Sequence, residues 1–262
     1  MAAGILQTFA FSALAVWLAM TGVWFVSLAR RDASIVDAFW GPGFALVAVV
    51  ALALDPPATP YRLLLVGMTV AWAARLGVHL LRRNLAHGED GRYREMRRKA
   101  GAGWALRSYV TVFLLQGALM WLISLPLQVA IVQGGAVRAG APLVIGGAGL
   151  FLFGFLFEAM ADRQLARFKA DTANAGKVLD TGLWRYSRHP NYFGEACVWW
   201  GLFLAALPAP GAAWTAFSPA VVTFLLLKVS GVPLTERHVA EGRPAYRDYI
   251  RRTSAFIPWP PR

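Results

Sequence analysis

The stretch 187-SRHPNYFGE-195 places an arginine, a histidine, an amide and a carboxylate at the start of a long apolar run. The proline in it favours an extended conformation in the residue before it, so a helix is expected to begin here. Asn191, Glu195 and Trp199 follow at intervals of four residues, which places them on one face of that helix. Such a face would suit a bound polar, planar ligand. Two further candidate binding residues of the motif are His189 and Tyr192.

The chain around this motif adds positive charge. Lys169, Lys177 and Arg188 could bind phosphate groups, either as point charges or as a guanidinium fork. The free backbone N–H groups of the first helical turn would point toward the same place. The structural alternative is that Glu195 and Arg188 form a buried ion pair without a ligand.

Two other basic segments, 82–104 and 236–262, are richer than a topology signal requires, because acids, histidine and tyrosine are mixed into them. The candidate binding residues in these segments are Arg83, Asn84, His238, Tyr249 and Arg252. An adenine-nucleotide cofactor with phosphates, bound from the cytoplasm, would explain all three clusters. The chain has no glycine-rich Rossmann fingerprint. The alternative for segment 82–104 is an amphipathic helix on anionic headgroups.

Ionisable residues at membrane depth form a second group. Asp37 lies in 34-SIVDAFWGPG-43, at the start of an apolar run, and is a functional candidate by default. Arg75 and His79 lie four residues apart on another expected helix, with Trp72 one turn earlier. A pair between Asp37 and this helix could be structural, or Asp37 could be a proton donor or substrate anchor beside a cofactor.

These residues need a membrane scaffold to position them. Hydrophobic residues make up 57% of the 262 residues and charged residues only 15%, whereas soluble domains have about 25%. Seven spanning helices are predicted, at about 5–28, 39–54, 61–81, 108–132, 142–160, 192–208 and 213–233. We therefore expect an all-α polytopic protein, one membrane domain over 1–262 with its cofactor-binding half at about 142–262. The 41-GPG-43 sequence could break or tilt the second helix.

The basic residues predict the orientation. Most of the 26 Lys and Arg residues fall in the first, third and fifth connections and in the tail, which places the N-terminus outside and the C-terminus in the cytoplasm. The net charge of +12 then reflects topology and is weak evidence for nucleic-acid binding. No metal site is expected, the sequence is silent on oligomeric state, and a bacterial inner membrane is the expected location.

Several motifs together resemble one known family. These motifs are GLWRYSRHPNYFGE, the tail YRDYIRRTSAFIP, SIVDAFWG, and RN followed by GEDGRY. Through them the chain resembles the steroid 5α-reductase family, specifically its bacterial branch of uncharacterised members. The resemblance covers nearly the whole chain. It implies a seven-helix membrane reductase that binds NADPH in a cytoplasm-facing cavity and transfers hydride to a carbon–carbon double bond conjugated to a ketone. The cofactor residues that it implies are Asp162, Lys169, Lys177, Asn191, Glu195, Trp199 and His238.

The catalytic side departs from that pattern. Steroid 5α-reductases resemble one another in a Gln–Glu pair at the start of the second helix and a tyrosine in the third. Here the pair reads Val36 and Asp37, and the tyrosine position holds Trp72, a poor proton donor. We expect hydride transfer to the β-carbon, with Asp37, or His79 through it, supplying the proton or the hydrogen bond to the oxyanion.

Two other functions use the same residues. An S-adenosylmethionine-dependent methyltransferase of the isoprenylcysteine type would use the RHPNY region, with Glu195 on the amine or ribose of its ligand. A non-enzymatic membrane protein would use the basic clusters for lipid headgroups. The number and spread of basic residues favour a multiply phosphorylated dinucleotide. The prediction is thus an NADPH-dependent reductase of a lipid-like substrate, whether steroid, prenyl or fatty.

Overall fold

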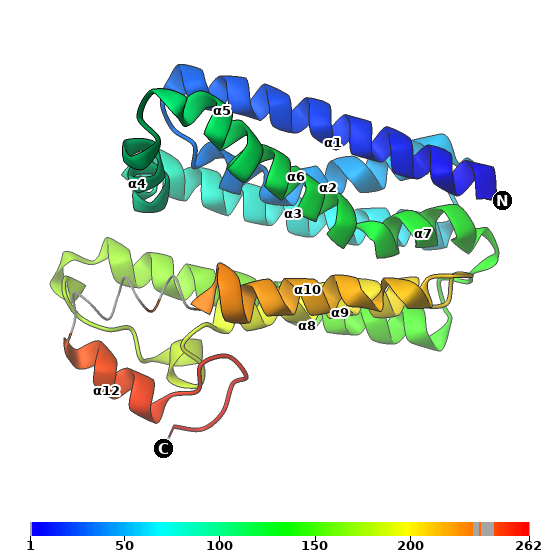
Figure 1. Cartoon of the computed structure of the whole chain (residues 1–262). Coiled ribbons are helices and arrows are strands. Elements are labelled where there is room, and N and C mark those ends of the chain that lie inside the picture. Colours follow the sequence, from blue (N-terminus) through cyan, green and yellow to red (C-terminus); the bar gives the residue numbers. More distant parts are fainter. Residues whose placement is uncertain (1, 233–235, 237–243, 262) are drawn as a thin grey trace. The chain divides into compact units, whose positions relative to one another are not determined.

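The computed structural model describes residues 2–232, 236 and 244–261, and every regular element in this part of the chain is helical (Figure 1). The chain divides into two compact units. Unit 1 comprises Met1–Val144 and Ala205–Thr215, and unit 2 comprises Ile145–Leu204 and Ala216–Arg262.

Unit 1 is a helical bundle centred on α2. Its helices are α1 (Ala2–Arg30), α2 (Ile35–Leu54), α3 (Pro60–His87), α4 (Gly91–Ala100), α5 (Trp104–Ser108), α6 (Leu115–Ile123) and α7 (Leu125–Gln133). A π-helical segment, Tyr109–Leu114, joins α5 to α6 without a break. α2 packs against α1, α3, α6 and α7, and its buried residues run from Val36 to Ala51.

Unit 2 contains the motif-bearing half of the chain. Its helices are α8 (Pro142–Ala170, whose first residues belong to unit 1), α9 (Pro190–Ala206), α10 (Phe217–Phe224) and α12 (Pro244–Arg252). The connection from α8 to α9 includes two short 3-10 turns, Thr172–Asn174 and Gly182–Arg185. This connection and α12 lie at the same end of the unit in Figure 1, and they carry the candidate binding residues Lys177, Arg188, His189, Tyr249 and Arg252.

The polar segment between α3 and α4 is shaped by local sequence signals. Gly88, with a φ of 69°, ends α3, and its N–H donates to the Asn84 carbonyl. Asp90 caps α4 by accepting a hydrogen bond from the Arg92 backbone N–H at 2.9 Å. The sequence GEDGR therefore forms a tight connection that returns the chain toward the start of α2, and this position matters for the site below.

Glycines allow α8 and α9 to pack closely. A Cβ on Gly154 of α8 would lie 2.6 Å from the Gly194 carbonyl oxygen of α9, and a Cβ on Gly201 would lie 2.8 Å from the Gly147 carbonyl oxygen. The two backbones can approach this closely only because side chains are missing there, as at many helix interfaces in membranes. This contact fixes Asn191 and its neighbours, which lie in the first turns of α9.

Five helices in the described residues are long and apolar enough to cross a membrane: Gly4–Arg30, Ile35–Leu54, Pro60–Ala86, Gly91–Ile123 and Pro142–Ala170. The predicted span 108–132 is interrupted at Ser124, and 213–233 is divided among a 3-10 turn, α10 and a π-helical segment. The second predicted span starts earlier than expected, at Ile35, and continues through the GPG sequence without a break. Seven spans and the orientation stay predictions.

Candidate functional site

The first polar cluster, the Asp37 cluster, lies in unit 1 where α2 begins and consists of Asp37, Asp90, Arg92 and Tyr93. The Tyr93 hydroxyl donates to Asp37 Oδ1 at 2.7 Å, and Arg92 Nη2 donates to Asp37 Oδ2 at 3.2 Å. Arg92 Nε also donates to Asp90 Oδ1 at 3.1 Å. Gln116 of α6 donates to the Tyr93 oxygen at 3.3 Å. Asp37 is therefore held by a phenol and a guanidinium from α4.

The connection before α4 is tied to the start of α2 by Ser34. Asn84 Nδ2 donates to the Ser34 carbonyl at 2.7 Å, and the Asp90 backbone N–H donates to Ser34 Oγ at 2.6 Å. Burial alone would raise the pKa of Asp90, but hydrogen bonds and charge from Arg92 lower it below its ordinary value. The predicted binding residue Asn84 thus has a structural role in bringing Asp90 and Arg92 to Asp37, and Arg83 lies 4.0 Å from Asp37 Oδ2.

The described partners of Asp37 are Arg92 and Tyr93 of α4 and Arg83 of α3, and a pair with Arg75 or His79 stays a prediction. Trp72 is fully buried, and its ring lies 5.9 Å from that of Phe44. His79 is half-buried on the same helix, two turns later. Tyr93 has the ionisable O–H group that Trp72 lacks, and the sequence had not predicted it as a site residue.

The second candidate site is a pocket of about 440 Å³ formed by residues of unit 2. Its wall contains the predicted residues Lys169, Arg188 and Tyr249, together with Asp171 and Trp184. Ligand pockets for small molecules typically have volumes of about 300–1,000 Å³ and a mostly apolar lining with a few polar groups. An aromatic and aliphatic wall with two cations suits a planar group that carries phosphate.

Arg188 is tied firmly into the protein. Its Nε donates to Glu236 Oε1 at 2.7 Å, and its Nη1 donates to the carbonyl oxygens of Ile250, at 3.0 Å, and Thr253. Tyr249 of α12 donates its hydroxyl to the Trp184 carbonyl. The pocket wall is therefore assembled by joining the α8–α9 connection to α12 and the residue after it.

His189 and Tyr192 lie beside this network. His189 is buried, with Nε2 at 3.1 Å from Glu236 Oε1, and its ring stacks on that of Tyr192 at 5.3 Å. Burial raises the pKa of Glu236, but the hydrogen bonds from His189 and Arg188 outweigh it and leave this pKa below its ordinary value. Burial also raises the pKa of Tyr246, another pocket residue, to about 12, so its phenol is protonated at neutral pH.

Of the predicted row on α9, Asn191 contacts α8. Asn191 Nδ2 donates to Asp162 Oδ1 at 3.2 Å, and Asp162 and Trp199 are both buried. The Asn191 Oδ1 atom is buried and has no hydrogen-bond partner among the described residues. Asn191 therefore joins α9 to α8, and the binding role of Asn191, Glu195 and Trp199 stays a prediction. Glu195 is half-buried.

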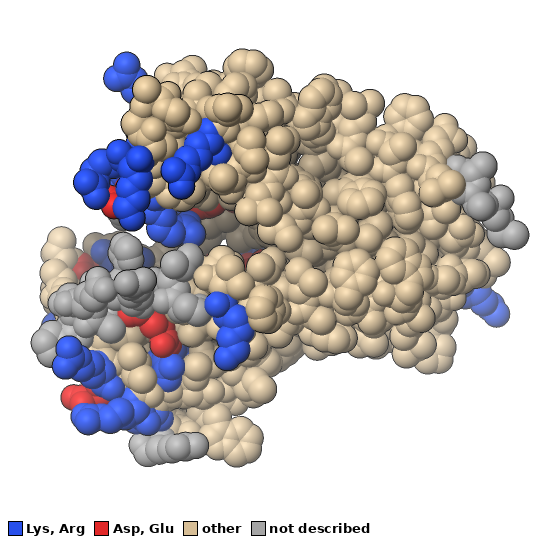
Figure 2. All heavy atoms as spheres, in the orientation of Figure 1, with Lys and Arg blue, Asp and Glu red and all other residues tan. Residues whose placement is uncertain are grey.

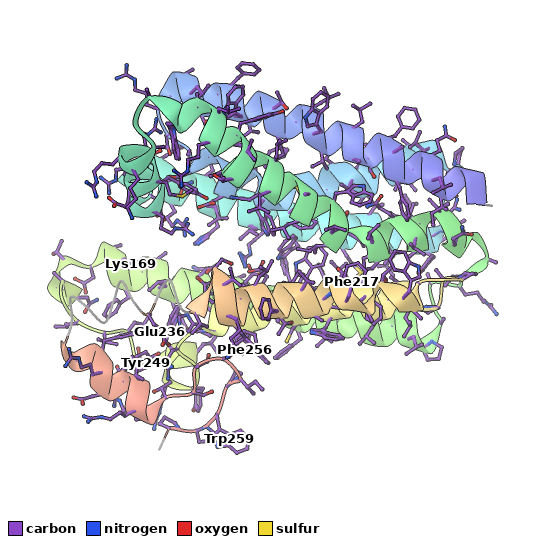
Figure 3. All side chains as sticks on the ribbon, viewed as in Figure 1. Lys169, Phe217, Glu236, Tyr249, Phe256 and Trp259 are labelled. Carbon is purple, nitrogen blue, oxygen red and sulfur yellow. The ribbon has the colours of Figure 1, made fainter. Side chains whose placement is uncertain are left out.

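The remaining predicted residues lie at the surface or outside the described part. Lys177 is exposed in the α8–α9 connection, and Arg252 pairs with Asp180. His238 lies outside the described residues. Figure 3 labels Lys169, Glu236 and Tyr249 in the part of unit 2 that contains the α8–α9 connection and α12.

Five residues of the two candidate sites were not predicted as site residues from the sequence: Arg92, Tyr93, Trp184, Glu236 and Tyr246. The Asp–Gly–Arg sequence before Tyr93 is a helix-start signal that would place Arg92 and Tyr93 in the first turn of a separate helix. No local pattern indicates that Glu236 pairs with Arg188.

Comparison with known proteins identifies the family but not an activity. Residues 23–253 match a family described as "Protein of unknown function (DUF1295)". The chain is also 27% identical, over 90% of its length and 75% of the relative's, to an uncharacterized protein of Schizosaccharomyces pombe. No solved structure matches the chain. The match to the family covers most of the chain, and several helices could cross a membrane. The chain is therefore a membrane protein that belongs to the DUF1295 family.

Proposed function

We propose that this protein is an NADPH-dependent membrane reductase that transfers hydride to a conjugated carbon–carbon double bond of a lipid-like substrate. The observation that carries the proposal is the pocket of unit 2, which has Lys169 and Arg188 beside aromatic and aliphatic walls. The resemblance of the motifs around Arg188 to steroid 5α-reductases supports the same assignment.

The pocket supports one nucleotide half of the cofactor. Trp184, Tyr246 and Tyr249 offer aromatic surface for a base, and Lys169 offers a point charge for a phosphate. Arg188, whose guanidinium is already bonded to Glu236, holds the pocket wall and adds positive charge. The 2′-phosphate distinguishes NADPH from NADH, and a basic residue such as Lys169 near it would favour NADPH.

The Asp37 cluster supports the proton-transfer half of the chemistry. Reduction of an enone places negative charge on the carbonyl oxygen, and a positioned phenol or carboxyl group can donate to it. The Tyr93 hydroxyl donates a hydrogen bond to Asp37, and Arg92 donates a second one that stabilises the carboxylate. We propose Asp37 and Tyr93 as the acid pair of the reaction.

The size and one residue of the pocket favour a second candidate function, the S-adenosylmethionine-dependent methyltransferase. A volume of 440 Å³ suits a single nucleoside-sized group, and Asp171 on the pocket wall is the type of residue that binds ribose hydroxyls. S-adenosylmethionine, the cofactor of the alternative methyltransferase, has this size and a ribose. NADH also has a free ribose 2′-hydroxyl that Asp171 could bind.

Thermal stability of the purified protein with each ligand tests the proposal, because a ligand that binds only the folded state raises its stability by about 2.7 kcal/mol at a hundred times its Kd. We expect stabilisation by NADPH and much less by NADH or S-adenosylmethionine. Lys169→Gln is expected to reduce the NADPH effect. Arg167→Gln is the matched control, since Arg167 is an exposed cation on the same helix that does not line the pocket. Stabilisation by S-adenosylmethionine alone would replace the reductase with the methyltransferase.

The acid pair is tested separately with Tyr93→Phe. This variant is expected to keep the stabilisation by NADPH and to lose NADPH-dependent reduction of lipid enones by about 10²-fold or more. Unchanged turnover in Tyr93→Phe would exclude Tyr93 as the proton donor while leaving the cofactor assignment intact.

A further inference from the structure

A hydrophobic surface at the C-terminus of unit 2 has no role in the function proposed above. Ile257 and Trp259 are 63% and 68% exposed, and Tyr186 beside them is 42% exposed. We call these three residues the tail surface. Figure 3 shows Trp259 directed away from α8 and α9, whereas Phe256 lies closer to these helices.

The tail surface is held rigidly. The Trp259 backbone N–H donates to the Tyr186 carbonyl at 2.9 Å, and the Arg188 N–H donates to the Ser254 carbonyl at 2.8 Å. Ser187 Oγ donates to the Phe256 carbonyl at 2.8 Å. Because the backbone on both sides of Ile257 is fixed, the exposure of these side chains is a property of the fold.

An aromatic column connects the tail to the apolar flank of a membrane-spanning helix. The Phe256 ring lies 5.8 Å from that of Phe193, which lies 5.5 Å from Phe157 and 6.4 Å from Phe153. Phe153 is in the middle of the candidate span Pro142–Ala170 and is 48% exposed. The tail therefore continues a surface that faces the hydrocarbon region.

The position of the tail corresponds to the edge of the bilayer. Arg163 is an exposed charged residue that follows Phe157 on α8 by less than two turns. An exposed charge on a spanning helix belongs at the headgroup level, so the end of the column nearest Phe256 lies near that level. Tryptophan and tyrosine prefer this region because one part of the side chain is apolar and another forms hydrogen bonds.

Charge around the tail surface favours the same partner. Arg185 and Arg251 are both exposed, and they belong to the 3-10 turn before Tyr186 and to α12. Figure 2 shows further Lys and Arg side chains at the end of unit 2 where α12 lies in Figure 1. Basic residues next to an exposed apolar group are typical of a surface that binds anionic lipid headgroups.

We infer that Tyr186, Ile257 and Trp259 form an interfacial anchor that inserts into the headgroup region of the bilayer containing α8. The anchor joins the α8–α9 connection to the membrane surface through the backbone of residues 186–188 and 254–259. The inference does not depend on the cofactor, because it rests on unit 2 contacts alone.

Single-cysteine labelling tests this anchor. The sole native cysteine, Cys197, is replaced by alanine, and Trp259→Cys or Ile257→Cys then carries an environment-sensitive fluorophore in phosphatidylcholine–phosphatidylglycerol vesicles. Leu156→Cys on α8, with a half-exposed side chain, is the lipid reference, and Ala173→Cys in the exposed turn is the water reference. Using two exposed tail positions keeps the test valid if one variant does not fold.

We expect labels at 257 and 259 to be quenched by lipids with a nitroxide near the headgroup, and to be shielded from iodide several-fold better than the label at 173. Iodide quenching equal to that at 173, without quenching by lipid, would refute the anchor. Shielding from both quenchers would also refute it, since a protein partner would then cover the surface.

Discussion

Replacement of Arg188 by methionine is expected to lower the stability of the protein strongly, independent of any cofactor. Arg188 is 8% exposed and bonds to Glu236 and to two backbone carbonyls of the α12 region. Methionine keeps most of the apolar volume but removes a donor from three acceptors, and Glu236 then keeps, among the described residues, only its contact with His189. The variant thus separates the structural role of Arg188 from the phosphate-binding role that the sequence suggested.

The size of the effect follows from the partners that are left behind. Removing one member of a buried ion pair costs about 3–5 kcal/mol, and the Glu236 side chain is only 20% exposed. For a protein of this size, 1 kcal/mol corresponds to about 2–4 °C in Tm, so a loss of about 3 kcal/mol predicts a Tm decrease of about 6–12 °C. The double variant Arg188→Met/Glu236→Gln should recover part of this loss. The neutral glutamine at position 236 carries no charge that would lack the Arg188 guanidinium.

The assay is thermal unfolding in one detergent, with Arg251→Met as the control. Arg251 also pairs with an acid, Asp248, but its side chain is 79% exposed, so the control should lose no more than about 0.5 kcal/mol. Equal Tm values for Arg188→Met and Arg251→Met would refute the structural role. Strictly additive effects of the Arg188 and Glu236 changes would refute their coupling.

Two further predictions follow from packing and from charge. Gly201→Ala should lower the free energy of unfolding by about 1–3 kcal/mol, because its Cβ would overlap the α8 backbone. The control Gly149→Ala on α8, where the Cβ meets nothing within 4 Å, should not lower it. Equal Tm values for the two variants would contradict the close contact. Because the pKa of Glu236 is lowered in the folded state, its stabilising contribution is complete above its ordinary value of 4.5 and is lost as the pH falls through the lowered pKa. Glu236→Gln should accordingly show a shallower loss of Tm in acid than the wild type, and an identical profile would exclude Glu236 as a contributor.

Local sequence signals predicted several of the helices, although the predicted spans 108–132 and 213–233 are interrupted or divided. Pro190 begins α9 as expected, the apolar runs are helices, and the motif before α9 leads into a pocket wall that contains Arg188. These features depend on composition, periodicity and helix-start residues. For the same reason Asp37 was identified as unusual, since a carboxylate next to an apolar run is costly wherever its partners lie.

The partners themselves could not be predicted. Asp37 and Tyr93 are far apart in the sequence and meet only because the α3–α4 connection returns to the start of α2. Glu236 and Arg188 also pair through tertiary structure alone. The division of 213–233 among a 3-10 turn, α10 and a π-helical segment was not predicted either.

Equilibrium binding of NADPH to the purified protein, measured by calorimetry, is the most direct test of the proposed cofactor site. The account predicts saturable binding by the wild type and by Arg167→Gln, with an affinity at least about tenfold lower in Lys169→Gln, equivalent to the loss of about 1.4 kcal/mol. Absence of NADPH binding to the folded wild type, or equal affinities in Lys169→Gln and Arg167→Gln, would contradict the assignment of the unit 2 pocket to this cofactor.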